Sequence, residues 1–244
     1  MRLKILLESQ KPNLIPWDYR TTLTRMVYQI LAVSDPNYSQ WLHDEGFRRG
    51  SKVYRLFVYS DFQPSHYRAE KDGLYVSQWL TWQVASPDKR FVDKFEDGLK
   101  KRDQMLQLFQ STFNVVDILR LELPSFSGSL VLHTLSPIVV ATGDKQKSKH
   151  AIYLSPHQPE FTQALERNLI AKWEAFHKRT WSGKKFGVRV WNPNKKLFRV
   201  FDIHVPAWDL KVQMWGSEEL IRFAYDTGIG EKNSQGFGMI EVGG

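Results

Sequence analysis

Residues 124–129 read PSFSGS, and this short stretch decides how the rest of the chain is interpreted. Proline, serine and glycine are typical of a linker rather than of a helix or a strand interior. On each side of the stretch, apolar residues recur with period two, typical of strands, and with a period of about 3.6, typical of amphipathic helices. The sequence therefore predicts two domains, residues 1–123 and 130–244.

The first half begins with alternating apolar residues at 3–7, which predict a strand, followed by a loop containing Pro12 and Pro16. Apolar residues at helical spacing between positions 23 and 31 predict a helix. Asp35-Pro36 ends that helix and can begin a second short one, since proline is favoured at a first helical position. The remaining predicted elements are strands at 53–60 and 74–84, a helix from Ser86-Pro87 and a strand at 113–123.

The second half repeats the pattern. Its predicted elements are β-rich residues 130–142, a long helix from Ser155-Pro156, a hairpin of 186–191 and 197–205 around Asn192-Pro193-Asn194, a strand at 208–215, a helix from Ser217 to Asp226 and a strand at 237–242. Each half thus approximates β-α-β-β-α-β. We expect an α+β fold of two tandem ferredoxin-like (RRM-like) domains.

Composition excludes several classes of protein. Hydrophobic residues make up 42% of the 244 residues, which is ample for a core. The absence of cysteine excludes disulfides, thiol nucleophiles and cysteine-ligated zinc. No stretch approaches the ~20 apolar residues of a membrane span, and RLKILLE at 2–8 is too short and charged for a signal sequence. We expect a cytoplasmic protein with no membrane partner.

Positive charge is concentrated in one region. The formal net charge is +8, and residues 143–200 alone hold thirteen Lys and Arg against four Asp and Glu. A concentrated basic region favours a polyanionic partner such as nucleic acid, because each neutralised phosphate releases counterions. The alternative is a solvated basic surface without a partner.

A glycine-rich run, GIGEKNSQGFG at 228–238, is the most specific local feature. It is not a phosphate-binding Walker loop, and it is not a dinucleotide fingerprint because it leads into a strand. Its four glycines permit backbone conformations that direct several N–H groups at one anion, with Lys232 adding charge. The alternative is a glycine-rich bulge between a helix and an edge strand.

The longer run TGIGEKNSQGFGMIEV at 227–242 resembles the C-terminal motif of the CRISPR repeat-processing endoribonucleases of the RAMP superfamily. Further similar stretches are MVYQILAVSDP (26–36), WLHDEGF (41–47), YRLFVYS (54–60) and HTLSPIVV (133–140). The resemblance implies a double ferredoxin-like fold that cuts repeat RNA in a precursor transcript to give mature guide RNAs. It also implies attack by a 2′-hydroxyl, 2′,3′-cyclic phosphate and 5′-hydroxyl products, and no metal or cofactor.

Such chemistry needs a proton acceptor, and histidine suits it because its unperturbed pKa lies near 6.5. His43 is the candidate because it falls within the LHDEG match and projects about 150° from the apolar side of its short helix. Tyr28 lies ~120° off the apolar stripe of the preceding helix, so its hydroxyl can reach a cleft. With an ordinary pKa near 10, Tyr28 is suited to orienting phosphate or donating a proton. The alternatives are a surface histidine and an ordinary half-exposed tyrosine.

The catalytic cation has two candidates. Some family members carry lysine immediately before the LF-x-YS-like strand, where this chain has Arg55; Lys52 lies three residues earlier and could substitute. Arg55 alternates with Val53, Phe57 and Tyr59 on the predicted strand, a basic and aromatic face suited to RNA. Arginine can grip phosphate but cannot shuttle a proton.

The resemblance and the charge together assign RNA contacts to two sets of residues. They are Gly228, Gly230, Lys232, Gly236 and Gly238 in the glycine run, and Lys184, Lys185, Lys195, Lys196 and Arg199 around the predicted hairpin. The alternative for the second set is a sheet edge protected by lysine. Asp44 and Glu45 point in different directions on a helix, so we expect no metal site.

Two other functions stay open. One is a non-catalytic protein of the same superfamily that binds repeat RNA, although the presence of His43 argues against it. The other is a nucleotide-sensing double ferredoxin-like module. The sequence also leaves open a homodimer and an association with a CRISPR effector complex.

Overall fold

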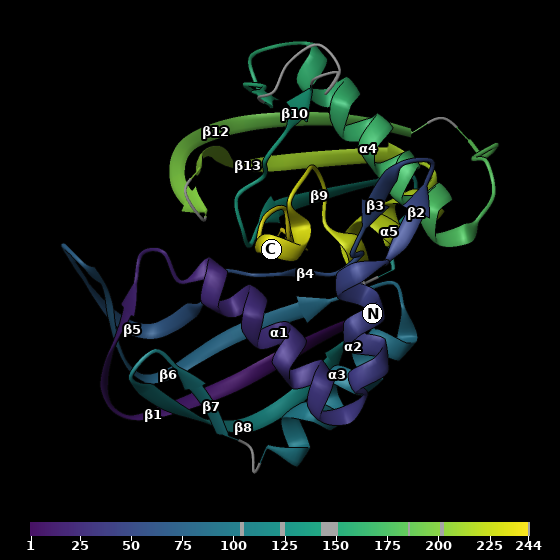
Figure 1. The fold of residues 1–244 in the computed structure, drawn as a ribbon. Helices are drawn as coiled ribbons and strands as arrows, with labels where there is room; N and C mark the ends of the chain where they lie inside the picture. The colour runs from purple at the N-terminus through teal and green to yellow at the C-terminus, as the bar shows by residue number, and fades with distance from the viewer. Residues whose placement is uncertain (103–104, 123–124, 143–150, 185, 201–202, 244) are drawn as a thin grey trace.

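A computed structural model describes residues 1–102, 105–122, 125–142, 151–184, 186–200 and 203–243. Figure 1 shows two stacked halves: the first half of the chain forms the lower sheet with its helices on one face, and the second half forms the upper sheet. No helix among the described residues has the length and apolar character needed to cross a membrane.

The first half is built around an antiparallel sheet. Its elements are β1 (Arg2–Pro16), α1 (Arg20–Ser34), α2 (Pro36–Asp44), β2 (Phe47–Arg49), β3 (Lys52–Tyr54), β4 (Val58–Tyr59), β5 (Gln63–Glu70), β6 (Gly73–Ala85), α3 (Lys89–Lys101), β7 (Met105–Leu108) and β8 (Ser111–Leu121). The strand order is β4-β6-β1-β8-β7, with β5 also paired to β6. Strands β1 and β6 therefore lie in the middle of the sheet.

The second half forms its own sheet with the same connectivity. Its elements are β9 (Ser129–Thr134), β10 (Ala141–Thr142), β11 (Ile152–Tyr153), α4 (Glu160–His177), β12 (Phe186–Val200), β13 (Ile203–Gly216), α5 (Glu218–Thr227), the 3-10 helix η1 (Asn233–Gln235) and β14 (Ile240–Val242). The order β12-β13-β9-β14 matches β4-β6-β1-β8. The expected fold of two tandem ferredoxin-like units is confirmed. The domain boundary stays a prediction, and Leu123 and Pro124 lie outside the described residues.

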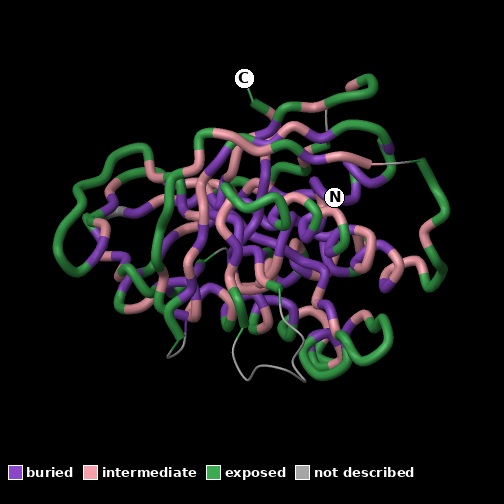
Figure 2. The backbone as a smooth tube through the Cα atoms, turned by 90° about the horizontal axis from the view of Figure 1, so that it is seen from above, coloured by how far each residue is buried: buried purple, intermediate pink, exposed green. Residues whose placement is uncertain are grey.

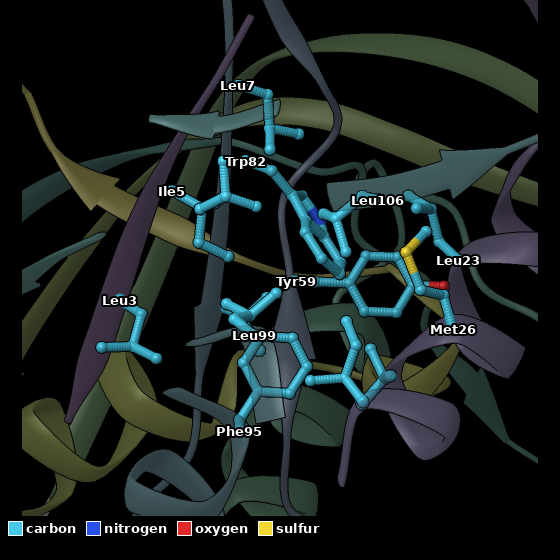
Figure 3. Packing of buried hydrophobic residues seen from close by; sticks show 14 of the residues in the cluster. Leu3, Ile5, Leu7, Leu23, Met26, Tyr59, Trp82, Phe95, Leu99 and Leu106 are labelled. Atoms are coloured by element: carbon cyan, nitrogen blue, oxygen red, sulfur yellow. The ribbon is translucent and has the colours of Figure 1, made fainter. Parts of the chain in front are cut away.

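Each sheet buries one face under its own helices. In the first half, Leu3, Ile5 and Leu7 of β1 pack with side chains of α1 and α3, as Figure 3 shows, and all three are at most 1% exposed. Figure 2 shows buried backbone running through the centre of the molecule, with exposed segments at its periphery. The alternating and helical apolar patterns in the sequence thus correspond to real core faces.

Two buried arginines join the halves. Arg2 Nη2 donates to the carbonyl oxygens of Tyr225, at 2.7 Å, and Ile240, at 2.8 Å. Arg20 Nη1 on α1 donates to Gly236 O at 2.8 Å, and its Nη2 pairs with Asp61 at 2.5 Å. Buried cations are stable only when paired and hydrogen-bonded, so these contacts fix α1 against the glycine run.

The predicted loop at Pro12 and Pro16 is wrong, because β1 continues through both residues. The pairing of β1 with β6 shifts register between Ser9 and Asn13, and its pairing with β8 ends at Glu8. Pro12 therefore sits at an irregularity where no ladder hydrogen bond is demanded of it.

The single strand predicted at 53–60 is also wrong. Lys52–Tyr54 pairs with β2 as a small hairpin, whereas Val58–Tyr59 pairs with β6. Leu56 has a φ of +40° between them, and its carbonyl accepts a 2.7 Å hydrogen bond from Ser86 Oγ. The predicted alternation of Arg55 with Phe57 and Tyr59 fails as well, because both rings are fully buried in the core.

The predicted hairpin around Asn192-Pro193-Asn194 is wrong. Strand β12 runs from Phe186 to Val200 and absorbs these residues as a bulge, with a register shift between Trp191 and Asn194 and a φ of +52° at Asn192. The pairing of β12 with β13 continues to its last residue, Val200, which lies opposite Ile203. Helices α3 and α4 also begin later than predicted, at Lys89 and Glu160.

Candidate active site

His43 stands at the C-terminal end of α2 with its side chain 68% exposed. The helix begins as predicted: the Asp35 side chain accepts a hydrogen bond from Tyr38 N at 3.0 Å, and Pro36 occupies the first turn. His43 Nδ1 lies 2.7 Å from Asp44 Oδ1, a hydrogen bond that lowers the pKa of Asp44. Since a carboxylate only accepts, Nδ1 is the donor in this bond, and in the neutral ring Nε2 is then the acceptor.

Tyr28 on α1 lies beside His43. The two ring centroids are 5.2 Å apart in an edge-to-face arrangement. Ser39 Oγ of α2 donates to the Tyr28 carbonyl at 2.9 Å and joins the two helices. Burial raises the pKa of Tyr28 to about 12, with Arg55 acting in the opposite sense. The Tyr28 hydroxyl therefore stays protonated and can act as a hydrogen-bond donor.

Both candidate cations lie close to these rings. The Arg55 guanidinium donates from Nη2 to the His43 carbonyl. Lys52 Nζ lies 2.9 Å from Glu231 Oε1 and 5.2 Å from the Tyr54 ring centroid. Burial alone would lower the pKa of Lys52, but the Glu231 carboxylate outweighs it and holds the pKa above its usual value. The Lys52 side chain is therefore charged at neutral pH.

The β2–β3 hairpin reaches across to the second half of the chain, as Figure 1 shows. Phe47 on β2 packs against Phe176 of α4 with ring centroids 5.4 Å apart, and the Arg49 guanidinium pairs with Glu174. The hairpin is therefore anchored to α4, which places Lys52 beside Glu231 of the glycine run.

The second half contributes a buried polar network. Lys172 of α4 is 2% exposed, and its Nζ donates to Gly228 O at 2.7 Å and to Asn233 Oδ1 at 3.0 Å. Asn233 Nδ2 in turn donates to the carbonyls of Ile229 and Phe237 at 3.0 and 2.9 Å. Burial lowers the pKa of Lys172 to about 7. These bonds tie the glycine run to α4.

His43, Tyr28 and both candidate cations line one cavity of about 370 Å³, together with Lys172 and Asn233. Its lining residues are Thr24, Tyr28, His43, Lys52, Val53, Tyr54, Arg55, Leu56, Asn168, Lys172, Gly230, Glu231, Lys232, Asn233, Ser234 and Gln235. Four lysine and arginine side chains line it against one carboxylate, that of Glu231. A cavity with this excess of cations suits a phosphate group.

Six of the cavity residues had been predicted from the sequence as site residues: His43, Tyr28, Arg55, Lys52, Gly230 and Lys232. The other three glycines, Gly228, Gly236 and Gly238, are not among the lining residues. Their amides donate to the carbonyls of Ala224, Asn233 and Pro137. The expected anion-binding nest is therefore not formed by these three amides, and their RNA contacts stay a prediction.

The other predicted basic cluster lies elsewhere. Lys184, Lys195, Lys196 and Arg199 are not among the residues that line the cavity. Lys196 pairs with Asp209 at 2.5 Å, and Lys195 Nζ lies 5.9 Å from the Trp208 ring. Lys185 lies outside the described residues. Contact of this cluster with RNA stays a prediction.

Sequence reasoning missed Asn168, Lys172 and Glu231. Asn168 Nδ2 donates to Glu231 Oε1 at 2.8 Å, which links α4 to the ion pair of Lys52. Asn168 and Lys172 are four residues apart and lie on the same side of α4 as the apolar residues Leu169 and Trp173. Two polar side chains on the buried face of a helix are the sequence feature that could have identified them.

Within the described residues, no group of three or more histidine, aspartate or glutamate side chains is arranged to hold a metal ion.

A family model described as CRISPR associated protein Cas6, C-terminal, matches residues 121–242, which is half of the chain. This chain belongs to the Cas6 family. The match covers β9 to β14 and includes the glycine run and both polar residues of α4.

Cas6 relatives match the first half as well. The CRISPR-associated endoribonuclease Cas6 1 of Methanocaldococcus jannaschii is 27% identical over 243 residues, covering 98% of this chain and 92% of that protein. The CRISPR-associated endoribonuclease Cas6 of Pyrococcus furiosus is 29% identical over 238 residues, covering 94% and 84%.

Solved structures agree with the family. A structure of a CRISPR associated protein Cas6 matches with a TM-score of 0.83 and 26% identity, covering 100% of this chain and 99% of that one. A RAMP protein described as binding different RNA substrates matches with a TM-score of 0.86, 21% identity and complete coverage of both chains, and therefore shares the fold. The predicted resemblance to the RAMP repeat-processing family is confirmed.

Proposed function

We propose that this protein is a metal-independent endoribonuclease that cuts CRISPR repeat RNA in the precursor transcript and gives mature guide RNAs. The endoribonuclease names of relatives that align over nearly the whole chain support the reaction class. The observation that carries the proposal is the convergence of His43, Tyr28, Lys52 and Arg55 on one cavity.

His43 takes the first proton. Its Nε2 accepts the proton of the 2′-hydroxyl beside the scissile phosphate, while Asp44 holds Nδ1–H. The 2′-oxygen then forms a bond to phosphorus as the bond from phosphorus to the 5′-oxygen breaks. The products are a 2′,3′-cyclic phosphate and a 5′-hydroxyl.

The cations of the cavity assist the departure of the 5′-oxygen and stabilise the negative charge on the phosphorane. Lys52 donates a proton to the departing 5′-oxygen, and Arg55 stabilises negative charge on the phosphorane without exchanging a proton. Tyr28 donates a hydrogen bond to a phosphate oxygen, which its pKa of about 12 allows at neutral pH. Lys172 and Asn233 hold the glycine run where Lys232 adds further positive charge.

The remaining assignments extend this proposal. Residues 1–123 carry the proton-transfer groups, and residues 130–244 carry the glycine run and the basic surface that contacts RNA. The Lys184–Arg199 region binds the RNA backbone away from the cut. A homodimer and an association with an effector complex stay predictions.

The test uses repeat RNA from the source organism and maps both product ends. We expect a cyclic phosphate and a 5′-hydroxyl, undiminished cleavage in EDTA and no cleavage when the nucleotide at the cut lacks its 2′-hydroxyl. Loss of activity in EDTA, or cutting of the 2′-deoxy RNA, would contradict the proposal. Tight binding of repeat RNA without any cleavage would favour the non-catalytic alternative.

A further inference from the structure

A second hollow lies along α1 and shares His43 with the cavity that Lys52 and Arg55 line. Its volume is about 460 Å³, and its lining residues are Thr21, Thr24, Arg25, Tyr28, Gln29, Ala32, Ser39 and His43. Thr24, Tyr28 and His43 line both hollows. The two spaces are therefore neighbours that share the proposed catalytic wall.

Helices α1 and α2 each form one wall of the hollow. Thr21, Arg25, Gln29 and Ala32 are spaced four, four and three residues apart and so form one face of α1. Ser39 and His43 are four residues apart on α2 and form the facing wall. Because Ser39 Oγ donates to the Tyr28 carbonyl, the two walls are held at a fixed separation.

Two side chains in this hollow are available to a ligand. Arg25 and Gln29 are exposed, and no hydrogen bond or ion pair joins either side chain to the part of the chain that the structure describes. By contrast, Thr24 Oγ1 is engaged with the Arg20 carbonyl at 3.0 Å and the Tyr59 hydroxyl at 2.7 Å. The hollow thus offers one cation and one amide beside the apolar surfaces of Tyr28 and Ala32.

This combination suits a nucleoside with one phosphate. Unpaired RNA bases are recognised by contacts to their flat faces together with hydrogen bonds to their edges, and glutamine can both donate and accept. A single arginine matches one flanking phosphate. The volume falls within the range of roughly 300–1,000 Å³ that is typical of small-ligand sites.

The position of His43 decides which nucleotide fits. If Nε2 accepts the proton of the 2′-hydroxyl, the ribose with that hydroxyl must touch His43. The phosphorane and the departing oxygen belong on the side of Lys52 and Arg55, in the cationic cavity. The nucleoside upstream of the cut then extends to the other side of the ring, which is the α1 hollow.

We propose that the hollow along α1 binds the nucleotide immediately upstream of the cut, with Gln29 reading its base and Arg25 holding its 5′-phosphate. This inference rests on the proposed function. It adds a specificity subsite made by Arg25 and Gln29, neither of which takes part in proton transfer.

The test combines protein variants with altered RNAs. Single-turnover cleavage is measured for the wild type and for the double variant Arg25→Ala/Gln29→Ala, on repeat RNA that is intact, abasic just upstream of the cut, or abasic just downstream. Lys101→Ala/Gln107→Ala is the control, because it removes one positive charge and one amide from exposed positions that line neither hollow.

Removing the upstream base should lower the single-turnover rate of the wild type and of the control about 3- to 10-fold, the effect of losing one or two hydrogen bonds. The double variant should cleave intact and upstream-abasic RNA equally slowly, and should keep the wild-type response to the downstream change. The proposed subsite would be overturned if removing the upstream base slowed the double variant as much as the wild type. It would also be overturned if the double variant lost its response to the downstream base and kept its response to the upstream one.

The two proposals fail in distinguishable ways. If His43→Ala leaves cleavage intact, the proposed function fails whatever the base preference. If His43→Ala abolishes cleavage while the double variant keeps the upstream preference, only the α1 subsite is wrong. Because Arg25 and Gln29 are exposed, their replacement should leave the thermal unfolding midpoint unchanged, which circular dichroism checks.

Discussion

Lys52 Nζ lies 2.9 Å from Glu231 Oε1, and this ion pair joins the β2–β3 hairpin of the first half to the glycine run of the second. Asn168 Nδ2 donates to the same carboxylate oxygen at 2.8 Å. Glu231 is the only carboxylate among the residues that line the cavity. A negative charge beside a phosphate site opposes RNA binding, so its contribution must come from placing Lys52.

Replacing Glu231 with Gln should therefore change binding and cleavage in opposite directions. RNA affinity should rise a few-fold because a like charge is removed, and the single-turnover rate should fall because Lys52 loses its partner. Filter binding and quenched-flow cleavage measure the two quantities, with Glu160→Gln on the exposed first turn of α4 as the control. Unchanged affinity and rate would show that the ion pair has no role in positioning.

The roles of Lys52 and Arg55 can be distinguished by the replacements that each position tolerates. Lys52→Ala should slow cleavage by on the order of 10²-fold, and Lys52→Arg should restore RNA binding but little of the rate, because arginine does not release a proton. Arg55→Lys should keep most of the activity. The assignment of the two roles is reversed if Arg55→Lys is the slower of the two conservative variants.

Stability should depend on pH through Lys172. Burial lowers its pKa to about 7, whereas an unfolded lysine titrates near 10.4. Between these values the unfolded chain binds more protons than the folded one, so this residue makes the free energy of unfolding rise with pH. Urea unfolding from pH 7 to pH 10 should show that rise in the wild type and in Lys101→Met, and a smaller rise in Lys172→Met. A constant difference between wild type and Lys172→Met across this range would contradict the burial argument.

Gly236 tests how tightly the glycine run is packed. Its φ is +82°, and an added Cβ would lie 2.3 Å from the buried Tyr59 ring, whereas Gly50 has a φ of +57° with open space around it. Gly50→Ala should cost only the left-handed conformation, about 1 kcal/mol, and Gly236→Ala about 2–4 kcal/mol because overpacking adds to it. Chemical denaturation measures the free energy of unfolding of both variants. Equal losses of stability would mean that the glycine run can shift to accommodate the added methyl group, which would contradict tight packing.

Much of the fold could be predicted from the sequence because local patterns and tertiary structure agree. The Asp35-Pro36 cap begins α2, Ser217 caps α5, and both strand-helix orders are as expected. Two strong turn signals led to wrong predictions. Pro12 and Asn192-Pro193-Asn194 lie inside strands, at positions where the pairing with the neighbouring strand shifts register. The sequence alone does not show where such register shifts occur.

The sequence predicted the cavity residues of the first half and, in the second half, only Gly230 and Lys232 of the glycine run. His43 and Tyr28 lie off the apolar stripes of their helices, and so helical geometry placed both at a cleft. The roles of Lys172 and Asn168 depend on α4 packing against the glycine run 56 residues later in the chain, as in the bond from Lys172 to Gly228. The sequence can show that both polar residues lie on the buried face of α4, but their partners follow only from the tertiary fold.

The account depends most on His43, whose ring is exposed at the junction of the two hollows. The direct measurement is single-turnover cleavage of repeat RNA by His43→Ala, with RNA affinity measured in parallel and His66→Ala on the exposed strand β5 as the control. We predict a rate lower by on the order of 10²–10⁴-fold with affinity roughly intact, and no loss in the control. Undiminished cleavage by His43→Ala would contradict the proposed mechanism.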